Sequence, residues 1–496
     1  MYLHQEHKVW LANGETRVYL EPSMANRHGL IAGATGTGKT VTLKVLAESF
    51  SDMGVPVFLA DIKGDLSGMC RTGQETKHIR RSIEDFSIEN FTYTPYPVRF
   101  WDVYGKLGLN VRTTISEMGP ELISRLLGLN DTQTGIMRIV FRIADDKGLL
   151  LIDLKDLRSM VQYVGDNAKE YKLTYGNIAP QSIGAIQRAL LALEDDGGNI
   201  FFGEPDLRLD DWIDWDDEGK GIMNILECQE LVQHPLLYAT FLLWMLSELY
   251  EMLPEAGDLE KPKLAFFFDE AHLLFNDAPK ALIEKVEQVV RLIRSKGVSV
   301  WFISQNPADI PDSILGQIGN RVQHALRAYT PRDQKALRAA AQSFRENLAF
   351  DTEEVLQTLG VGEALVSVLD EKGIPSIVQK AGILPPRSSM NAVPEDIILQ
   401  NLRTNPLFNK YNRLNDRESA YEILLEEQQE ADAEERKEKE REEKEKARAE
   451  REKSRRTSSG RKKSTVLDKA VSSAANTIGR EIGKKLVRGI LGSLKF

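Results

Sequence analysis

The fold of this chain is decided by residues 33–40, which read Gly33-Ala34-Thr35-Gly36-Thr37-Gly38-Lys39-Thr40. The three residues before this stretch, Leu30-Ile31-Ala32, are apolar and predict the end of a buried strand. Apolar residues at helical spacing follow as far as Phe50. A strand, a glycine-rich loop and a helix in this order form a Walker A motif, whose backbone N–H groups surround a phosphate chain. The stretch therefore predicts an α/β fold that binds a nucleotide.

Each residue type in this loop has a predicted role. The glycines leave space for backbone N–H groups to approach phosphate oxygens, which a Cβ atom would obstruct. Lys39 supplies a positive charge for the β and γ phosphates, and the Thr40 hydroxyl supplies a ligand for Mg²⁺. A glycine-rich turn without a ligand is the alternative, and the complete motif disfavours it. The predicted nucleotide-binding residues are Gly33, Ala34, Thr35, Gly36, Thr37, Gly38, Lys39, Thr40 and Val41.

Length and composition indicate the broad class of the protein. The 496 residues suffice for two or three domains, and a hydrophobic content of 42% supports a large core. No uncharged apolar run is long enough to span a bilayer, and the N-terminus lacks the features of a signal peptide. Cys70 and Cys228 form neither a disulfide framework nor a metal-binding spacing, so we expect a cytoplasmic protein.

The net charge of −10 is unevenly distributed along the chain. Residues 460–496 are rich in Lys and Arg, and the rest of the chain is correspondingly acidic. An acidic body disfavours broad nonspecific binding of nucleic acid to its outer surface, but it is compatible with a basic pore or groove.

Changes in composition predict how the chain is organised. Residues 416–456 consist mainly of Glu, Lys and Arg without apolar heptad positions, and they predict a solvated single helix or a disordered arm. Residues 467–490 carry an apolar stripe beside basic residues, and such a helix can dock on protein, membrane or nucleic acid. The predicted segments are short β segments at 1–28, a nucleotide-binding core at 29–114 and 211–386, a helical insertion at 115–210, a linker and charged arm at 387–460, and a basic amphipathic helix at 461–496.

A second part of the predicted site follows the apolar run 264–268, which predicts a buried strand. Asp269 and Glu270 come directly after it: Asp269 would hold Mg²⁺, and Glu270 would orient and deprotonate the attacking water. The alternative is that the pair only caps the next helix. Gln305 follows the next predicted strand and is a candidate to hydrogen-bond the γ-phosphate or the water. Polar groups at strand ends are where open α/β sheets place ligands.

A neighbouring subunit can supply an arginine that stabilises charge on the transferring phosphoryl group. Arg294, close to Lys296 and Gly297, is the candidate for this role. The alternatives are Arg291, Arg321 and Arg327, and any of these arginines can instead be an ordinary salt-bridge partner.

Several of these motifs occur in the same order in a known family. Beside the Walker loop they are Asp61-Ile62-Lys63-Gly64-Asp65-Leu66, Phe266-Phe267-Phe268-Asp269-Glu270-Ala271-His272-Leu273-Leu274-Phe275 and Ser304-Gln305-Asn306-Pro307. This set resembles the HerA/FtsK superfamily of ring-forming motor ATPases. The run 318–328 is similar to the YjgR-like bacterial branch of that superfamily. The resemblance covers approximately residues 20–390.

The resemblance implies a RecA-like parallel sheet, a hexamer with ATP between subunits, and movement of duplex DNA through the ring. It implies a role in trans for Arg294 and nucleotide roles for Lys39, Thr40, Asp269, Glu270 and Gln305. Our hypothesis from the sequence is a Mg²⁺-dependent ATP hydrolase that couples hydrolysis to DNA translocation or processing. The alternative is a nucleotide-controlled scaffold that recruits a protein or membrane-surface partner through its C-terminal tail.

Overall fold

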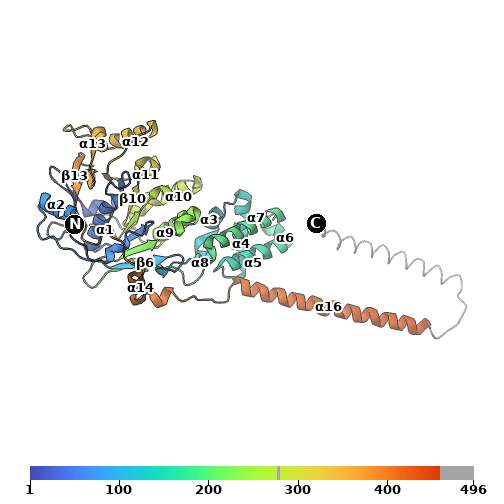
Figure 1. Cartoon of the computed structure of the whole chain (residues 1–496). Helices are drawn as coiled ribbons and strands as arrows, with labels where there is room; N and C mark the ends of the chain where they lie inside the picture. The colour runs from blue at the N-terminus through green and yellow to red at the C-terminus, as the bar shows by residue number, and fades with distance from the viewer. Residues whose placement is uncertain (258, 276–279, 458–496) are drawn as a thin grey trace. The chain divides into compact units, whose positions relative to one another are not determined.

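The computed structural model describes residues 1–257, 259–275 and 280–457. Contacts divide the chain into two units, of which the first spans Met1–Leu424 and the second begins at Leu425. Among the described residues, the strands form a 13-stranded sheet in the order β1-β2-β13-β12-β11-β4-β10-β9-β5-β8-β6-β7, with β3 paired to β2 (Figure 1). The helices and this sheet together confirm the α/β fold predicted from the sequence.

The central and larger part of the sheet is parallel. It consists of β11 (Asn320–Gln323), β4 (Gly29–Ala32), β10 (Val298–Ser304), β9 (Leu264–Phe268), β5 (Val57–Asp61), β8 (Met223–Glu227), β6 (Val98–Asp102) and β7 (Leu109–Asn110). Antiparallel pairing extends it beyond β11 through β12 (Glu363–Ser367), β13 (Gln379–Ile383), β2 (Lys8–Asn13), β1 (Tyr2–Leu3) and β3 (Arg17–Leu20). The N-terminal β segments therefore belong to the same sheet as the Walker strand.

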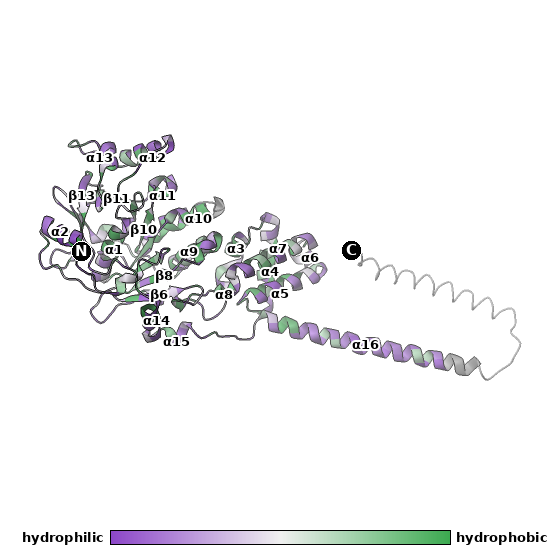
Figure 2. Ribbon diagram, in the orientation of Figure 1, coloured by the Kyte–Doolittle hydropathy of each residue, from purple (hydrophilic) through white to green (hydrophobic). Residues whose placement is uncertain are grey.

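Side chains that alternate along the central strands build a core on each face of the sheet. Phe267 of β9 and Trp301 of β10 stack with ring centroids 6.0 Å apart, in the core that includes α1 (Lys39–Asp52). Phe266 and Phe268 belong to the other core, with α9 (Pro235–Met252) and α10 (Lys280–Ile293). Burial of both faces explains why these strands read as continuous apolar runs. Figure 2 shows α9 as largely hydrophobic, in contrast to the long C-terminal helix.

Helices connect β7 to β8. They are α3 (Ile115–Leu126), α4 (Asp131–Lys147), α5 (Leu154–Asp166), α6 (Ala168–Tyr175), α7 (Pro180–Leu193) and α8 (Asn199–Phe201). The start of α4 shows why the sequence forms separate helices here: Asn130 and Gln133 make a capping box, and Gly148 ends the helix at φ 68°. The buried residues of this region belong to the same core as α9. The inserted helices therefore extend the main domain on one face of the sheet.

Other helices join the remaining strands or follow them. They are α2 (Lys77–Asp85), α11 (Asp312–Leu315), α12 (Pro331–Gln342), α13 (Thr352–Thr358), α14 (Glu395–Thr404), α15 (Phe408–Tyr411) and α16 (Ala420–Thr457).

Residues 387–424, which we call the C-terminal strap, are not the linker predicted from the sequence. The backbone N–H groups of Arg387 and Ser388 donate to the buried carboxylate of Glu48 on α1, at 2.8 and 2.9 Å. The buried Lys44, also on α1, donates to Ser389 O at 2.9 Å. The prediction was wrong because Pro385 and Pro386 mark a break in regular structure, whereas the chain beyond them continues to make buried contacts.

The rest of the strap contacts the far edge of the sheet and the inserted helices. Asn401 Nδ2 donates to Val98 O of β6 at 3.2 Å. Tyr411 is fully buried, and its backbone oxygen accepts a hydrogen bond of 3.0 Å from Arg112. Ser419 Oγ donates to Asp156 of α5 at 2.6 Å. Each of these hydrogen bonds joins the strap to a segment far away in the sequence. The compact unit therefore includes the strap, and it ends at Leu424.

From Leu425 onward, the described part of α16 is an exposed, charged helix. Ion pairs at i,i+4 spacing join Glu435 to Lys439 and Glu440 to Lys444, as expected for a helix that is stabilised by its own side chains. The basic amphipathic helix predicted at 461–496 lies outside the described residues. No helix in the described ranges has the length and apolar character needed to cross a membrane.

The strap contacts predict which truncations the protein tolerates. A chain that ends at Arg387 loses Tyr411 and leaves several buried polar groups unpaired, at a cost of several kcal/mol. We expect its thermal unfolding midpoint to fall by roughly 5 °C. A chain that ends at Glu427 keeps the strap and should match the full-length midpoint within about 2 °C. Equal midpoints for the two truncations would show that the strap does not belong to the core.

Candidate active site

The Walker loop joins β4 to α1 at the carboxyl edge of the sheet. Gly36 and Gly38 have φ angles of 75° and 115°, which L-residues with a Cβ rarely adopt. A Cβ on Gly38 would also lie 3.1 Å from Gly362 N, in the loop before β12. The first turn of α1 begins directly after Gly38, so its unpaired N–H groups are available to an anion. The loop therefore has the backbone form of a phosphate cradle.

His324, just beyond β11, supports this loop from behind. Its backbone N–H donates to Ala32 O at 2.7 Å, and its ring lies between Thr42 Oγ1 (2.8 Å to Nε2) and Glu363 O (3.0 Å to Nδ1). Burial lowers the pKa of His324 to about 4, so the ring is neutral and donates from Nδ1. Gly362 N also donates to Thr37 O at 3.0 Å. His324 and Gly362, both far from the Walker loop in the sequence, thus fix the shape of that loop.

Lys39 is buried at the start of α1. Its ammonium donates to the loop's own carbonyl oxygens, at 2.6 Å from Gly33 O and 3.1 Å from Ala34 O. Burial lowers its pKa, and the charge of Glu270 opposes this effect. Lys39 is thus a desolvated cation enclosed by the loop, which suits it to bind a phosphate oxygen. Thr40, the predicted Mg²⁺ ligand, is the next residue of α1.

Asp269 and Glu270 lie at the end of β9, which β10 separates from the Walker strand β4. Asp269 is buried and accepts a hydrogen bond from Glu270 N at 2.9 Å, and burial raises its pKa. Glu270 adopts a left-handed backbone conformation, with φ 46°. This conformation is costly for a residue with a Cβ, and it turns the chain sharply at the strand end.

Three side chains converge on the Glu270 carboxylate. Lys63 Nζ lies 2.7 Å from Oε1, Gln305 Nε2 lies 3.3 Å from Oε2, and His272 Nδ1 lies 3.3 Å from Oε2. Burial is the largest single influence on the pKa of Glu270 and raises it, but the hydrogen bond and charge of Lys63, with smaller contributions from Gln305 and His272, together lower the pKa. The structure therefore brings Gln305 to Glu270, as its position after β10 predicts. It also adds Lys63, to which the sequence interpretation gave no role.

Arg294 lies away from this cluster within the chain. It begins the short 3₁₀ helix Arg294–Lys296, which precedes β10, whereas Gln305 follows β10. The seven residues of β10 therefore separate the two positions, by roughly 20 Å in an extended strand. Arg294 cannot contact the Walker residues of its own chain, and a role in catalysis requires a second chain.

A row of carboxylates continues along the same edge of the sheet. Asp61, Glu227 and Asp102 end the adjacent strands β5, β8 and β6 and are register partners. Asp61 accepts hydrogen bonds from Gly64 N (2.7 Å) and Leu66 N (3.0 Å), yet burial raises its pKa to about 7. Burial likewise raises the pKa of Glu227 to about 7. Among the described residues, no cluster of these side chains has the arrangement of a metal site.

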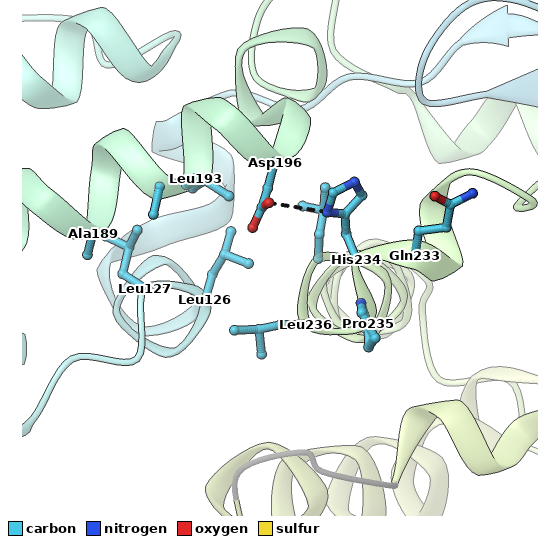
Figure 3. A pocket seen from close by; sticks show the side chains of 11 residues that line it. Leu126, Leu127, Ala189, Leu193, Asp196, Gln233, His234, Pro235 and Leu236 are labelled. Atoms are coloured by element: carbon cyan, nitrogen blue, oxygen red, sulfur yellow. Dashed lines mark ion pairs between the residues drawn. The ribbon is translucent and has the colours of Figure 1, made fainter.

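A pocket of about 320 Å³ lies elsewhere, between the ends of α3 and α7 and the start of α9 (Figure 3). Leucines such as Leu126 and Leu193 line it, and Asp196 faces His234 at 3.3 Å. None of the predicted site residues lines this pocket. It does not contribute to the nucleotide site.

The fold and the site together define a RecA-like P-loop NTPase. The chain belongs to the helicase HerA-like C-terminal family, whose profile matches residues 6–496. It is 24% identical to the DNA double-strand break repair helicase HerA of Saccharolobus solfataricus, over 68% of this chain and 61% of that protein. It is 22% identical to a probable helicase of Methanocaldococcus jannaschii, over 69% of this chain and 60% of that protein. The match thus spans about three fifths of each relative's length.

The fold is also similar to a solved structure. The bacterial conjugative coupling protein TrwBdeltaN70 superposes with a TM-score of 0.51 at 14% identity, covering 76% of this chain and 89% of that chain. At this level of identity the likeness concerns the fold.

The raised pKa of Glu227 predicts a pH-dependent stability. Its pKa is about 7 in the folded chain and about 4.5 when unfolded, so folding becomes less favourable as pH rises between these values. Asp61, Asp102 and Glu230 face the same carboxylate and add repulsion. We expect Glu227→Gln to stabilise the protein by about 1 kcal/mol at pH 8, after allowance for solvent screening, and by less at pH 6.

Thermal unfolding at the two pH values measures this difference. Glu15→Gln, a change at an exposed residue, is the matched control and should shift neither midpoint. A stabilisation by Glu227→Gln that is equal at pH 6 and pH 8 would show that ionisation of Glu227 is not its cause.

Proposed function

We propose that the protein is a Mg²⁺-dependent ATPase that works as an oligomer, with a hexamer as the expected form, and couples hydrolysis to moving or processing duplex DNA. The observation that carries the ATPase proposal is the meeting of two groups at one edge of the sheet. The Walker loop follows β4, and the Asp269, Glu270 and Gln305 cluster follows the neighbouring strands β9 and β10.

ATP with Mg²⁺ fits the residues at this edge. The φ angles of the loop glycines, the open space beside Gly36 and the enclosed ammonium of Lys39 suit a phosphate chain. Thr40 and Asp269 are oxygen donors of the kind that Mg²⁺ prefers. Bound ATP would supply the phosphoanhydride bond that water cleaves.

Different side chains of the protein have different roles in hydrolysis. Lys39 would bind the phosphates, and Thr40 and Asp269 would hold the metal. Glu270 accepts a proton from the attacking water at its carboxylate, and Gln305 orients that water through its side-chain amide. Support for DNA as the substrate comes from the family resemblance and from the HerA relative, a DNA double-strand break repair helicase.

The proposal predicts ATP turnover that duplex DNA stimulates. Glu270→Gln should retain nucleotide binding and lower turnover by roughly 10²–10⁴, because it removes the proton acceptor and keeps the shape. Lys39→Ala should lose both turnover and most of the binding. Turnover with and without duplex DNA, together with mass measurement in nucleotide, checks these outcomes. Slow turnover that ignores DNA but controls capture of a protein partner would favour the scaffold alternative.

Arg294 is proposed to act across the interface between subunits. If so, mixing Arg294→Ala with Lys39→Ala should restore part of the activity, because one interface then combines the intact Lys39 of one chain with the intact Arg294 of the other. Lys39→Ala mixed with Glu270→Gln is the matched control. Lys39 and Glu270 serve the same site of one chain, so this mixture should stay inactive. Absence of recovery in oligomers shown to be mixed would rule out Arg294 as the residue in trans.

A further inference from the structure

Lys63 is presented by a rigid loop. The loop follows β5, and the Asp61 carboxylate accepts hydrogen bonds from Gly64 N and Leu66 N within it. Lys44 of α1 also donates to Asp65 O, at 2.9 Å. These contacts fix the backbone on both sides of Lys63 and leave its side chain 45% exposed. A half-exposed lysine on a fixed backbone can exchange one nearby acceptor for another.

A second strand-end aspartate also holds the loop that follows it, without a lysine two residues after the aspartate. Asp102 at the end of β6 accepts from Tyr104 N, Lys106 N and Leu107 N, whereas Asp61 accepts from Gly64 N and Leu66 N. The position that corresponds to Lys63 is Tyr104 in this second loop, and Lys106 forms an exposed ion pair with Glu230. The role of Lys63 must therefore be sought in its contacts outside the loop.

Those contacts are the two catalytic-site carboxylates. Lys63 Nζ lies 2.7 Å from Glu270 Oε1 and 3.6 Å from Asp269 Oδ2. Gln305 approaches the other oxygen of Glu270, so both oxygens of this carboxylate are engaged. In this arrangement each oxygen of Glu270 already accepts a hydrogen bond, and the Lys63 ammonium stabilises the negative charge of the carboxylate. The charge of Lys63 also acts to lower the pKa of Lys39.

We propose that Lys63 is a positioning residue that exchanges its contact with Glu270 for one with the terminal phosphate of a nucleoside triphosphate. Its departure leaves a carboxylate oxygen of Glu270 free to act as the base. The inference rests on the proposed function. A triphosphate is a more highly charged acceptor than a carboxylate, and a diphosphate lacks the terminal group, so Lys63 discriminates between ATP and ADP.

The first test is the binding of ATP and ADP, measured separately with Mg²⁺ by calorimetry. Lys63→Met should weaken ATP binding about tenfold and change ADP binding less than about twofold, because it removes one charged hydrogen bond to the terminal phosphate. Lys63→Arg should restore part of the preference for ATP. Lys106→Met, in the second loop, should leave both affinities unchanged. Equal weakening of ATP and ADP by Lys63→Met, or no weakening, would overturn the inference.

A second comparison does not depend on the folding of Lys63→Met alone. Glu270→Gln releases Lys63 from its ionic partner, so it should raise the preference for ATP over ADP several-fold. Lys63→Met combined with Glu270→Gln should abolish that gain, since the two residues are coupled. A gain that persists in the double variant would contradict the exchange. Failure of the unaltered protein to bind ATP would instead reject the proposed function itself.

Discussion

The structure depends on the parallel alignment of its central strands. Strands β4, β10, β9 and β5 are buried on both faces, so their side chains are apolar along most of their length. Because these strands run in the same direction, their carboxyl ends all lie at one edge of the sheet. The polar residues of the candidate site therefore gather at that edge, and they come from segments more than 200 positions apart in the sequence. The site residues lie close together because the strands that they follow are neighbours in the sheet.

Concentrating charge at this edge has an energetic cost that the surrounding contacts offset. A buried carboxylate is unfavourable unless cations or N–H groups compensate its charge. Asp61 has two backbone N–H groups, and Glu270 has Lys63 and Gln305. Compensation by the Lys63 ammonium differs from compensation by backbone N–H groups, because the half-exposed lysine side chain can rotate to another acceptor. Under the exchange proposed for Lys63, the environment of the Glu270 carboxylate changes during the reaction cycle.

Local patterns were sufficient to predict part of the site. The Walker loop and the Asp269-Glu270 pair are recognisable because each is a short motif beside an apolar strand. Lys63 and His324 were not assigned roles, since their contacts join segments that only the folded sheet brings together. The strap was misread for the same reason: two prolines are visible in the sequence, whereas the contact of Tyr411 with Arg112 is not. For Arg294, the residue type suggested a role in the site, but the direction of β10 places this residue at the opposite edge of the sheet from Gln305.

The attachment of the strap decides how a mechanical load on the C-terminal helix would enter the protein. The chain leaves the compact unit at Leu424, directly after Ser419 is held by Asp156 of α5. Tension on α16 would therefore be borne first by the inserted helices. The remaining strap contacts lead back to Glu48 and Lys44, on the helix that carries the Walker loop. The strap contacts are thus arranged in series along the chain, and the last of them, counted back from α16, are on α1, the helix that follows the Walker loop.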